Sequence, residues 1–421
     1  MEISFQRRSY IGLIYLKDIF ILVVPGVVTY ALGEYKYYKY FYIVDDDVLS
    51  STLWASYIII AFVVSLSVLF RIGRQQKAIS RVKLFENEHE LFHLKKILYS
   101  SIVTIFALLI LLTMSGTQHA LLASILGGDL ISLRLSNRYS GVPTIILSAL
   151  QFLNIFAWVI FGVVFRSINR SPTLILIFFL VIASTYLGNK AAIAMNIFSS
   201  IIAYATANKI KVNYRNTFKL VIGILVILTA FIVMSYYQFK NDSGFDLVSY
   251  TMIRGLMGQV GGFYEQMSLK LNDFNYIWHS VPFANYFISY PIYNKDLMMM
   301  TWGANLLSME DTGVMNSIFG GEAFAIGGYP LLAVSPIIVA LNYFIAYSVV
   351  SRLLRKLGGL TKDSSKLISA ILIASSFSLT ADFAGVFLLK YTIMITVFLI
   401  PPLVLKKYFY NKFYVRNFNI Q

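Results

Sequence analysis

Long apolar runs are the feature that most constrains how this chain can fold. One of them, TLILIFFLVIASTYLG, covers residues 173–188, and several others reach about 18 residues, enough to cross a bilayer as a helix. A lipid-exposed backbone must satisfy its own hydrogen bonds, which leaves only helices or a closed β-barrel. Barrel strands alternate apolar and polar residues, and these runs do not. With 58% hydrophobic and 13% charged residues, the sequence predicts an all-α polytopic membrane protein.

Apolar runs between charged breaks predict ten transmembrane spans in one integral membrane domain, residues 1–421. The predicted spans are 11–32, 51–70, 98–115, 142–165, 172–188, 191–208, 218–237, 324–350, 367–381 and 384–405. The first is interpreted as an uncleaved helix, because its apolar stretch is long and lacks an A-x-A-like cleavage site. The one large loop, residues 238–323, lies between the seventh and eighth spans.

Lysine and arginine are concentrated in alternate loops. The two termini and every second loop hold 24 of the 35 basic residues, whereas the remaining loops hold nine. The positive-inside rule therefore places both termini in the cytoplasm and the 238–323 loop outside. The net charge of +15 is accordingly interpreted as a topology signal, and no nucleic-acid partner is predicted.

The predicted outer face carries 14 of the 20 acidic residues, so we look there for chemistry. In the stretch NSIFGGEAFAIGGYPLLAVSPIIVAL, Glu322 follows Gly320 and Gly321 at the mouth of the eighth span. A carboxylate is favoured at a helix N-terminus, and that alone would explain Glu322. The functional alternative is a general base or an acceptor for a sugar hydroxyl, with the glycine pair letting a bulky glycan come close.

The segment DLVSYTMIRGLMGQVGGFYEQM in the large outer loop repeats apolar residues every three or four positions. This spacing predicts an amphipathic helix along the membrane surface, with Arg254 and Glu265 at headgroup depth. Two interpretations of Arg254 remain open. It either anchors the helix by snorkelling or binds a lipid phosphate through its guanidinium.

Three other outer cations are candidates for binding an anion. Lys190, in STYLGNKAAIAMN, begins the sixth span at a helix N-terminus, where anions are favoured; an exposed lysine in a tight turn is the plainer interpretation. Arg134 and Arg138 would share a helix face, although surface charge is the plainer interpretation of both. The run Asp45 to Asp47 reads as a solvated turn. The four histidines show no zinc spacing, and we find no nucleotide-binding fingerprint, so no metal or cofactor is predicted.

The order of three short motifs resembles the O-antigen polymerases, integral membrane polymerases of oligosaccharide repeat units. The motifs are GNKAA at the turn between the fifth and sixth spans, Arg254 in the large outer loop, and FGGEAFAIGGYPLLAV entering the eighth span. The resemblance covers most of the chain. The family often has Gly-x-Arg where this chain has Gly188-Asn189-Lys190, and lysine cannot make the two-pronged phosphate contact of arginine.

The resemblance implies a metal-independent glycosyltransferase of GT-C-like architecture in the bacterial cytoplasmic membrane, without a cofactor. Its donor and acceptor would both be oligosaccharides on undecaprenyl diphosphate at the outer leaflet, and a chain-length regulator protein is a further candidate partner. Four cations would balance the leaving diphosphate: Arg254, Lys190, Arg134 and Arg138. Three groups would serve the acceptor hydroxyl: Glu322, Glu265 and His279.

Two alternatives remain. An O-antigen ligase would share fold and donor and differ in its acceptor. A flippase or transporter of lipid-linked sugar should carry polar groups through the middle of the membrane, where the predicted spans hold only Lys17, Asp18 and Lys390.

Overall fold

The computed structural model describes residues 48–72, 88–127, 144–187, 190–208, 261–281, 287–302, 317–377 and 382–408, with the single positions 133, 229 and 284. Within these ranges every regular element is a helix. The α-helices are α4 (Val48–Ile72), α5 (Glu88–Met114), α6 (Ala120–Ile125), α8 (Thr144–Val164), α9 (Arg170–Thr185), α10 (Lys190–Ala207), α13 (Gly261–Leu269), α14 (Tyr293–Trp302), α15 (Phe319–Lys356), α16 (Lys362–Ser376), α17 (Phe383–Phe387) and α18 (Lys390–Leu405). Two 3-10 helices join them, η1 (Phe165–Ser167) and η2 (Phe274–Ser280).

Four of these helices are long and apolar enough to cross a membrane, which confirms a membrane-embedded helical protein. They are Leu49–Phe70, Glu88–Met114, Ile145–Ser167 and Phe319–Lys356. Three shorter helices are also apolar: Arg170–Thr185, Ala192–Ala207 and Lys390–Leu405. The predicted first span (11–32) lies outside the described residues, as does the predicted seventh (218–237) apart from position 229.

The boundaries correct two of the predicted spans. Helix α5 begins at Glu88 rather than at residue 98, so its first turns carry charged residues. The predicted span 384–405 is two helices, because Leu389 adopts a left-handed conformation with φ 58° between α17 and α18. The left-handed residue Leu389 makes Lys390 the first residue of α18, whereas the sequence analysis placed Lys390 inside the span 384–405.

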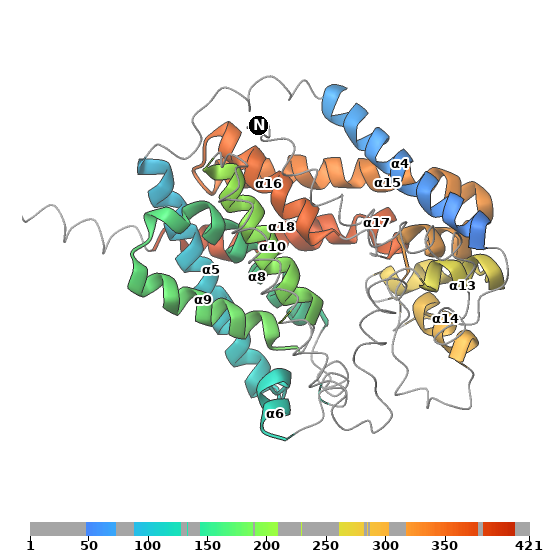
Figure 1. The fold of residues 1–421 in the computed structure, drawn as a ribbon, viewed down its shortest axis with the longest axis horizontal. Coiled ribbons are helices and arrows are strands. Elements are labelled where there is room, and N and C mark those ends of the chain that lie inside the picture. The colour runs from blue at the N-terminus through green and yellow to red at the C-terminus, as the bar shows by residue number, and fades with distance from the viewer. Residues whose placement is uncertain are drawn as a thin grey trace, which may run out of the picture.

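Helix α15 runs along the long axis of the molecule (Figure 1). Helices α5, α8, α9 and α10 form one group, in which α8 packs against the other three. Helix α4 lies along α15, and α16 and α18 pack between α15 and α8. Helices α13 and α17 and η2 also pack against α15, while α14 packs against α13.

Close helix contacts and buried polar bonds hold the first group together. A Cβ at Gly162 on α8 would lie 2.2 Å from the carbonyl oxygen of Ser200 on α10, so only glycine permits this approach. Ser184 Oγ on α9 accepts hydrogen bonds from the side chains of Asn154, at 2.8 Å, and Asn196, at 3.0 Å. In an apolar interior such bonds satisfy groups that would otherwise be costly to bury.

Two glycines break α15 near its start. Gly327 has φ −144° and ψ 20°, and Gly328 has φ 63° and ψ −158°, so the backbone is not helical there. The conformation of Gly328 is left-handed and favours glycine, and Pro330 then begins the longer part without an amide hydrogen to donate. The break separates a short first segment, residues 319–326, from the part that is long enough to cross the membrane. Glu322 lies on this short segment.

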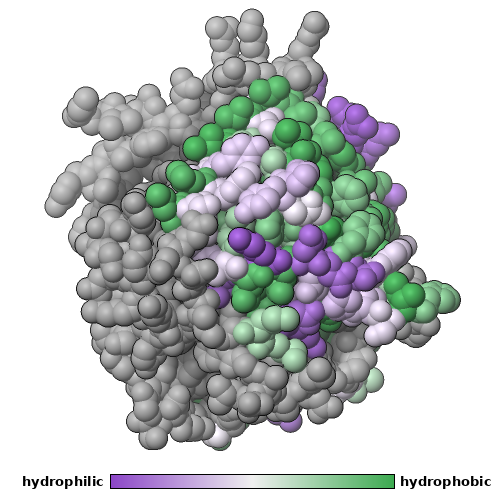
Figure 2. Space-filling model, turned by 90° about the vertical axis from the view of Figure 1, so that its right-hand side faces the viewer, coloured by the Kyte–Doolittle hydropathy of each residue, from purple (hydrophilic) through white to green (hydrophobic). Residues whose placement is uncertain are grey.

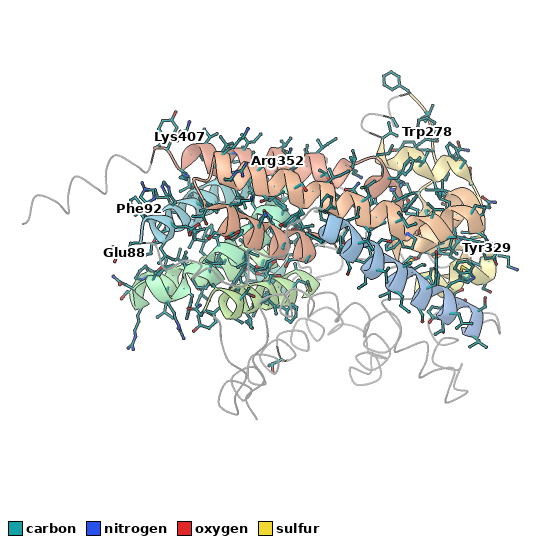
Figure 3. The ribbon with its side chains drawn as sticks, turned by 90° about the horizontal axis from the view of Figure 1, so that it is seen from above. Glu88, Phe92, Trp278, Tyr329, Arg352 and Lys407 are labelled. Carbon is teal, nitrogen blue, oxygen red and sulfur yellow. The ribbon has the colours of Figure 1, made fainter. Side chains whose placement is uncertain are left out.

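The residues labelled in Figure 3 mark two opposite ends of the molecule. Glu88, Phe92, Arg352 and Lys407 lie at one end of the molecule, whereas Trp278 and Tyr329 lie at the other (Figure 3). We call the first the basic end, formed by residues 88–96, 352–366 and 406–408. We call the second the loop end, formed by α13, α14, η2, α17 and the short first segment of α15.

Candidate functional site

At the loop end, four chain segments bring five polar side chains together. The end of η2, the short first segment of α15 and the starts of α17 and α18 contribute them. The five are His279, Ser280, Glu322, Asp382 and Lys390. Figure 2 faces this side of the molecule and shows hydrophilic residues gathered in its middle, with hydrophobic residues around them.

His279 and Asp382 form the centre of this cluster. His279 Nε2 lies 3.2 Å from Asp382 Oδ2, and His279 Nδ1 lies 2.6 Å from the carbonyl oxygen of Tyr276. A carbonyl only accepts, so Nδ1 carries a hydrogen. Ser280 Oγ donates to Asp382 Oδ2 at 2.7 Å. These bonds fix both the ring and the carboxylate.

Glu322 supports the cluster from the buried side. Its Oε2 accepts hydrogen bonds from the backbone amides of Phe383 and, at 3.4 Å, Ala384. It therefore caps the start of α17, where Asp382 makes no side-chain cap of its own, and leaves Asp382 to face His279. Oε1 of Glu322 lies 3.6 Å from His279 Nδ1. Glu322 therefore lies in the first turn of its own helix, α15, and also caps the N-terminus of a second helix, α17.

Lys390 completes the cluster on its more open side. Its Nζ lies 3.8 Å from Asp382 Oδ2. The side chain of Lys390 is 33% exposed, that of His279 17% and that of Glu322 3%. A ligand at this end would therefore meet the two basic groups before it met Glu322.

The charges of the cluster stabilise one another. Burial alone would raise the pKa of Asp382, but the hydrogen bond from His279, the charge of Lys390 and the hydrogen bond from Ser280 hold that pKa at about 2. Burial lowers the pKa of His279, but its hydrogen bond to Asp382 and the charge of Glu322 outweigh burial and raise that pKa above its usual value. These shifts favour the imidazolium form of His279 facing the carboxylate form of Asp382.

The structure brings together two of the residues proposed from the sequence, Glu322 and His279. Glu265 lies in α13 and is fully buried. In the described part of the chain neither of its carboxylate oxygens has a hydrogen-bond partner, and burial raises its pKa to about 8. It is therefore a neutral acid at pH 7 and is not bonded to the cluster. The backbone of Lys190 begins α10.

Several sequence candidates lie outside the described residues. These are Arg134, Arg138, Arg254 and the run from Asp45 to Asp47. The side chain of Lys190 is likewise not described. Their assignment to the site stays a prediction.

The glycine pair before Glu322 has a different role from the one expected. A Cβ at Gly320 would lie 2.3 Å from Ile58 Cδ1, and one at Gly321 would lie 2.4 Å from Ser317 Oγ and 2.7 Å from Tyr293 Oη. Both glycines therefore let protein groups pack closely, and they do not open Glu322 to a bulky glycan. The expectation of a glycan approaching across this pair is corrected.

Sequence reasoning missed Asp382, Lys390 and Ser280. In the stretch SLTADFAGVFLLKYT, residues 378–392, only positions 382 and 383 lie between the two predicted spans. The signal that could have identified the site is that Asp382 and Lys390 lie in apolar surroundings, where a charged side chain requires a partner. Gly385 in α17 lets the Asp382 carboxylate lie close to the helix, because a Cβ there would lie 2.5 Å from Asp382 Oδ2.

The described part of the chain thus defines a helical membrane-embedded protein with a charged cluster at one end. Within that part, no group of three or more ligating side chains is placed to hold a metal ion. No family model matches the chain, and no characterised protein or solved structure matches it either.

Proposed function

We propose that this protein is a membrane glycosyltransferase that polymerises oligosaccharide repeat units carried on undecaprenyl diphosphate, with the ten-span, GT-C-like arrangement expected from the sequence. The proposed setting is the outer leaflet of the bacterial cytoplasmic membrane. The observation that carries the proposal is the cluster of His279, Asp382 and Lys390 at the end opposite the basic end. The resemblance to O-antigen polymerases supplies the substrate class.

The reaction needs positive charge for its leaving group. The acceptor hydroxyl forms a bond to C1 of the donor sugar, and the bond from C1 to the diphosphate oxygen breaks with its electron pair. Without a metal, that developing charge must be balanced by side chains held in place beforehand. Lys390 and His279 are the more accessible basic groups of the cluster, and Arg254 is proposed to join them on the diphosphate.

The acceptor hydroxyl needs a hydrogen-bond acceptor. Among the described residues, the contacts that Asp382 makes to His279, Ser280 and Lys390 all involve Oδ2, and we assign Oδ1 the role of accepting from the hydroxyl. Because its pKa is about 2, the Asp382 carboxylate orients the acceptor hydroxyl through a hydrogen bond. The proton of that hydroxyl passes to the departing diphosphate or to water. Glu322 is 2% exposed, so we assign it a positioning role through His279 and α17.

Polymerase, ligase and transporter predict different products in a deletion strain. Loss of a polymerase keeps single repeat units on the surface lipid and removes the long ladder. Loss of a ligase removes even the single unit, and loss of a transporter traps lipid-linked units on the inner leaflet. Absence of any attached unit would argue against polymerisation. Lys390, paired with Asp382 at the loop end, does not supply the mid-membrane charge that transport would need.

Substitutions in the cluster test the site itself. We expect Asp382→Asn and Lys390→Gln to shorten or abolish the ladder at normal protein levels. His119→Gln is the matched control, because His119 bonds the backbone carbonyl of Ile182 at 3.0 Å and lies outside the cluster. Glu322→Gln should impair the ladder and reduce protein stability together. A normal ladder from both Asp382→Asn and Lys390→Gln would refute this site.

A further inference from the structure

A single side-chain amide lies in α15. Asn342 is the one asparagine or glutamine among residues 319–356, and it is 3% exposed. An amide is costly to place in an apolar interior unless its donor and its acceptor are hydrogen-bonded. Both are bonded here, and their partners lie on two other helices, α17 and α18.

The two bonds join the amide to the chain on either side of Leu389, the left-handed residue that separates α17 from α18. Asn342 Nδ2 donates to the carbonyl oxygen of Val386, near the end of α17. Asn342 Oδ1 accepts from Thr392 Oγ1 at 2.8 Å, in the first turn of α18. Because a carbonyl oxygen only accepts, the atom that faces Val386 is the nitrogen, and the orientation of the amide is fixed.

Helix α15 therefore holds α17 at both ends. The backbone amides of Phe383 and Ala384 at its start donate to Glu322 Oε2, and the carbonyl oxygen of Val386 near its end accepts from Asn342. Helix α17 has only five residues, and a helix this short is not stable by itself, so its contacts decide where it lies. It packs against α15 (Figure 1), and the two side chains of α15 set its position.

The break in α15 makes this double contact possible. Glu322 and Asn342 are 20 residues apart in the sequence, which would separate them by about 30 Å in a straight helix. A Cβ at Gly320 would lie 3.1 Å from Leu332 Cδ1, although a straight helix would separate these two residues by about 18 Å along its axis. The short first segment therefore lies back against the longer part of α15, so Glu322 reaches the start of α17 while Asn342 reaches its end.

The position of α17 decides the geometry of the charged cluster. Asp382 is the N-cap residue of α17, and its Oδ2 lies 3.2 Å from His279 Nε2 and 3.8 Å from Lys390 Nζ. Lys390 is the first residue of α18, two residues before Thr392. Through α17, Asn342 acts on the position of Asp382, and through Thr392 it acts on the position of Lys390.

We infer that Asn342 is a positioning residue of this cluster, which holds α17 and the start of α18 so that Asp382 faces both His279 and Lys390. Its part in catalysis rests on the function proposed above, whereas the geometry that it fixes can be measured without activity. Loss of the bonds to Asn342 would let Asp382 move away from His279 and weaken the hydrogen bond between them.

Substitutions in the full-length chain remove the bonds and keep the packing. Asn342→Leu replaces the amide by an apolar side chain of similar size and removes both bonds. Thr392→Val removes only the bond to α18, and Thr392→Ser keeps the hydroxyl that makes it. Asn154→Leu is the matched control, because Asn154 is a buried amide on α8 that donates to Ser184 Oγ at 2.8 Å, outside the cluster.

The pKa of His279 in the purified protein reports the geometry of the cluster. The hydrogen bond to Asp382 raises that pKa, so a movement of Asp382 away from the ring lowers it. We expect Asn342→Leu to lower the pKa by most of the change that Asp382→Asn causes, and Thr392→Val to lower it less. Thr392→Ser and Asn154→Leu should keep the wild-type pKa, although Asn154→Leu should lower the unfolding temperature through loss of a buried hydrogen bond.

The polysaccharide ladder tests the link to catalysis. At normal protein levels, Asn342→Leu and Thr392→Val should shorten the ladder, whereas Asn154→Leu should leave it intact. Thr392→Ser should give a normal ladder. Rescue by serine would not follow from packing alone, because serine restores the hydroxyl but fills less space than valine.

Two results would overturn the inference. One is a wild-type His279 pKa in Thr392→Val and, where it folds, in Asn342→Leu, although Asp382→Asn lowers that pKa. The other is an equal fall of the pKa in Asn154→Leu, because the pKa would then report a general loss of stability. A lowered pKa in Asn342→Leu, together with normal ladders from Asp382→Asn and Lys390→Gln, would confirm the positioning role and refute the function proposed for the cluster.

Discussion

The replacement Asp382→Asn tests the charge balance of the loop-end cluster directly. Asparagine keeps the shape of the side chain and can still accept from Ser280, but it removes the negative charge facing His279 and Lys390. Asp382 accepts from His279 at 3.2 Å and from Ser280 at 2.7 Å, and its side chain is 13% exposed. The charge is therefore little screened by water, and its removal should have a measurable cost.

The size of the effect follows from the pKa of Asp382. That pKa falls from 3.8 in the unfolded chain to about 2 in the folded protein, a difference that corresponds to about 2 kcal/mol at 1.36 kcal/mol per unit. Because the folded pKa is the lower one, the stabilisation is present above pH 3.8 and is lost as the pH falls toward 2. Asp382→Asn should lose it at every pH above that window.

Two measurements check this prediction. Unfolding in detergent at pH 7 gives the loss of stability, with Asp363→Asn as the control, because Asp363 lies in the first turn of α16 at the other end. Selective labelling of the four histidines for NMR gives the pKa of His279, identified by its absence in His279→Gln. We expect Asp382→Asn to lower that pKa. An unchanged His279 pKa together with unchanged stability would refute the reasoning.

Three further predictions concern other parts of the chain. Glu265→Gln should stabilise the protein by up to about 3 kcal/mol at pH 7. The folded pKa of Glu265 is about 8, so the stability of the wild-type protein falls as the pH rises from 4.5 toward 8. A lower free energy of unfolding for the variant, measured with denaturant, would contradict this prediction. Gly321→Ala should lower the free energy of unfolding by about 1–3 kcal/mol, because the added methyl group is overpacked against Tyr293. The unfolding temperature should fall accordingly. An unchanged unfolding temperature would mean that the side chains around residue 321 move to make room for the methyl group. Arg254→Ala should abolish the ladder and Arg254→Lys should restore part of it; equal ladders from both variants would exclude a two-pronged phosphate contact.

The sequence by itself determined the class of protein and much of its helix content. The apolar runs predicted as spans 51–70, 142–165 and 172–188 overlap α4, α8 and α9, with boundaries that differ by no more than three residues. These predictions succeed because a helix satisfies its backbone hydrogen bonds within its own segment, so a local pattern is enough.

Only the tertiary structure decided which polar groups meet. His279 and Asp382 are 103 residues apart, and Glu322 and Phe383 are 61 apart, so no local spacing connects them. The sequence singled out Glu322 and His279 but missed Asp382, because a lone acid in a turn shows its importance only once its partners are known. Packing of η2, α15 and α17 supplies those partners, and burial there gives their charges an effect that the same residues would not have in water.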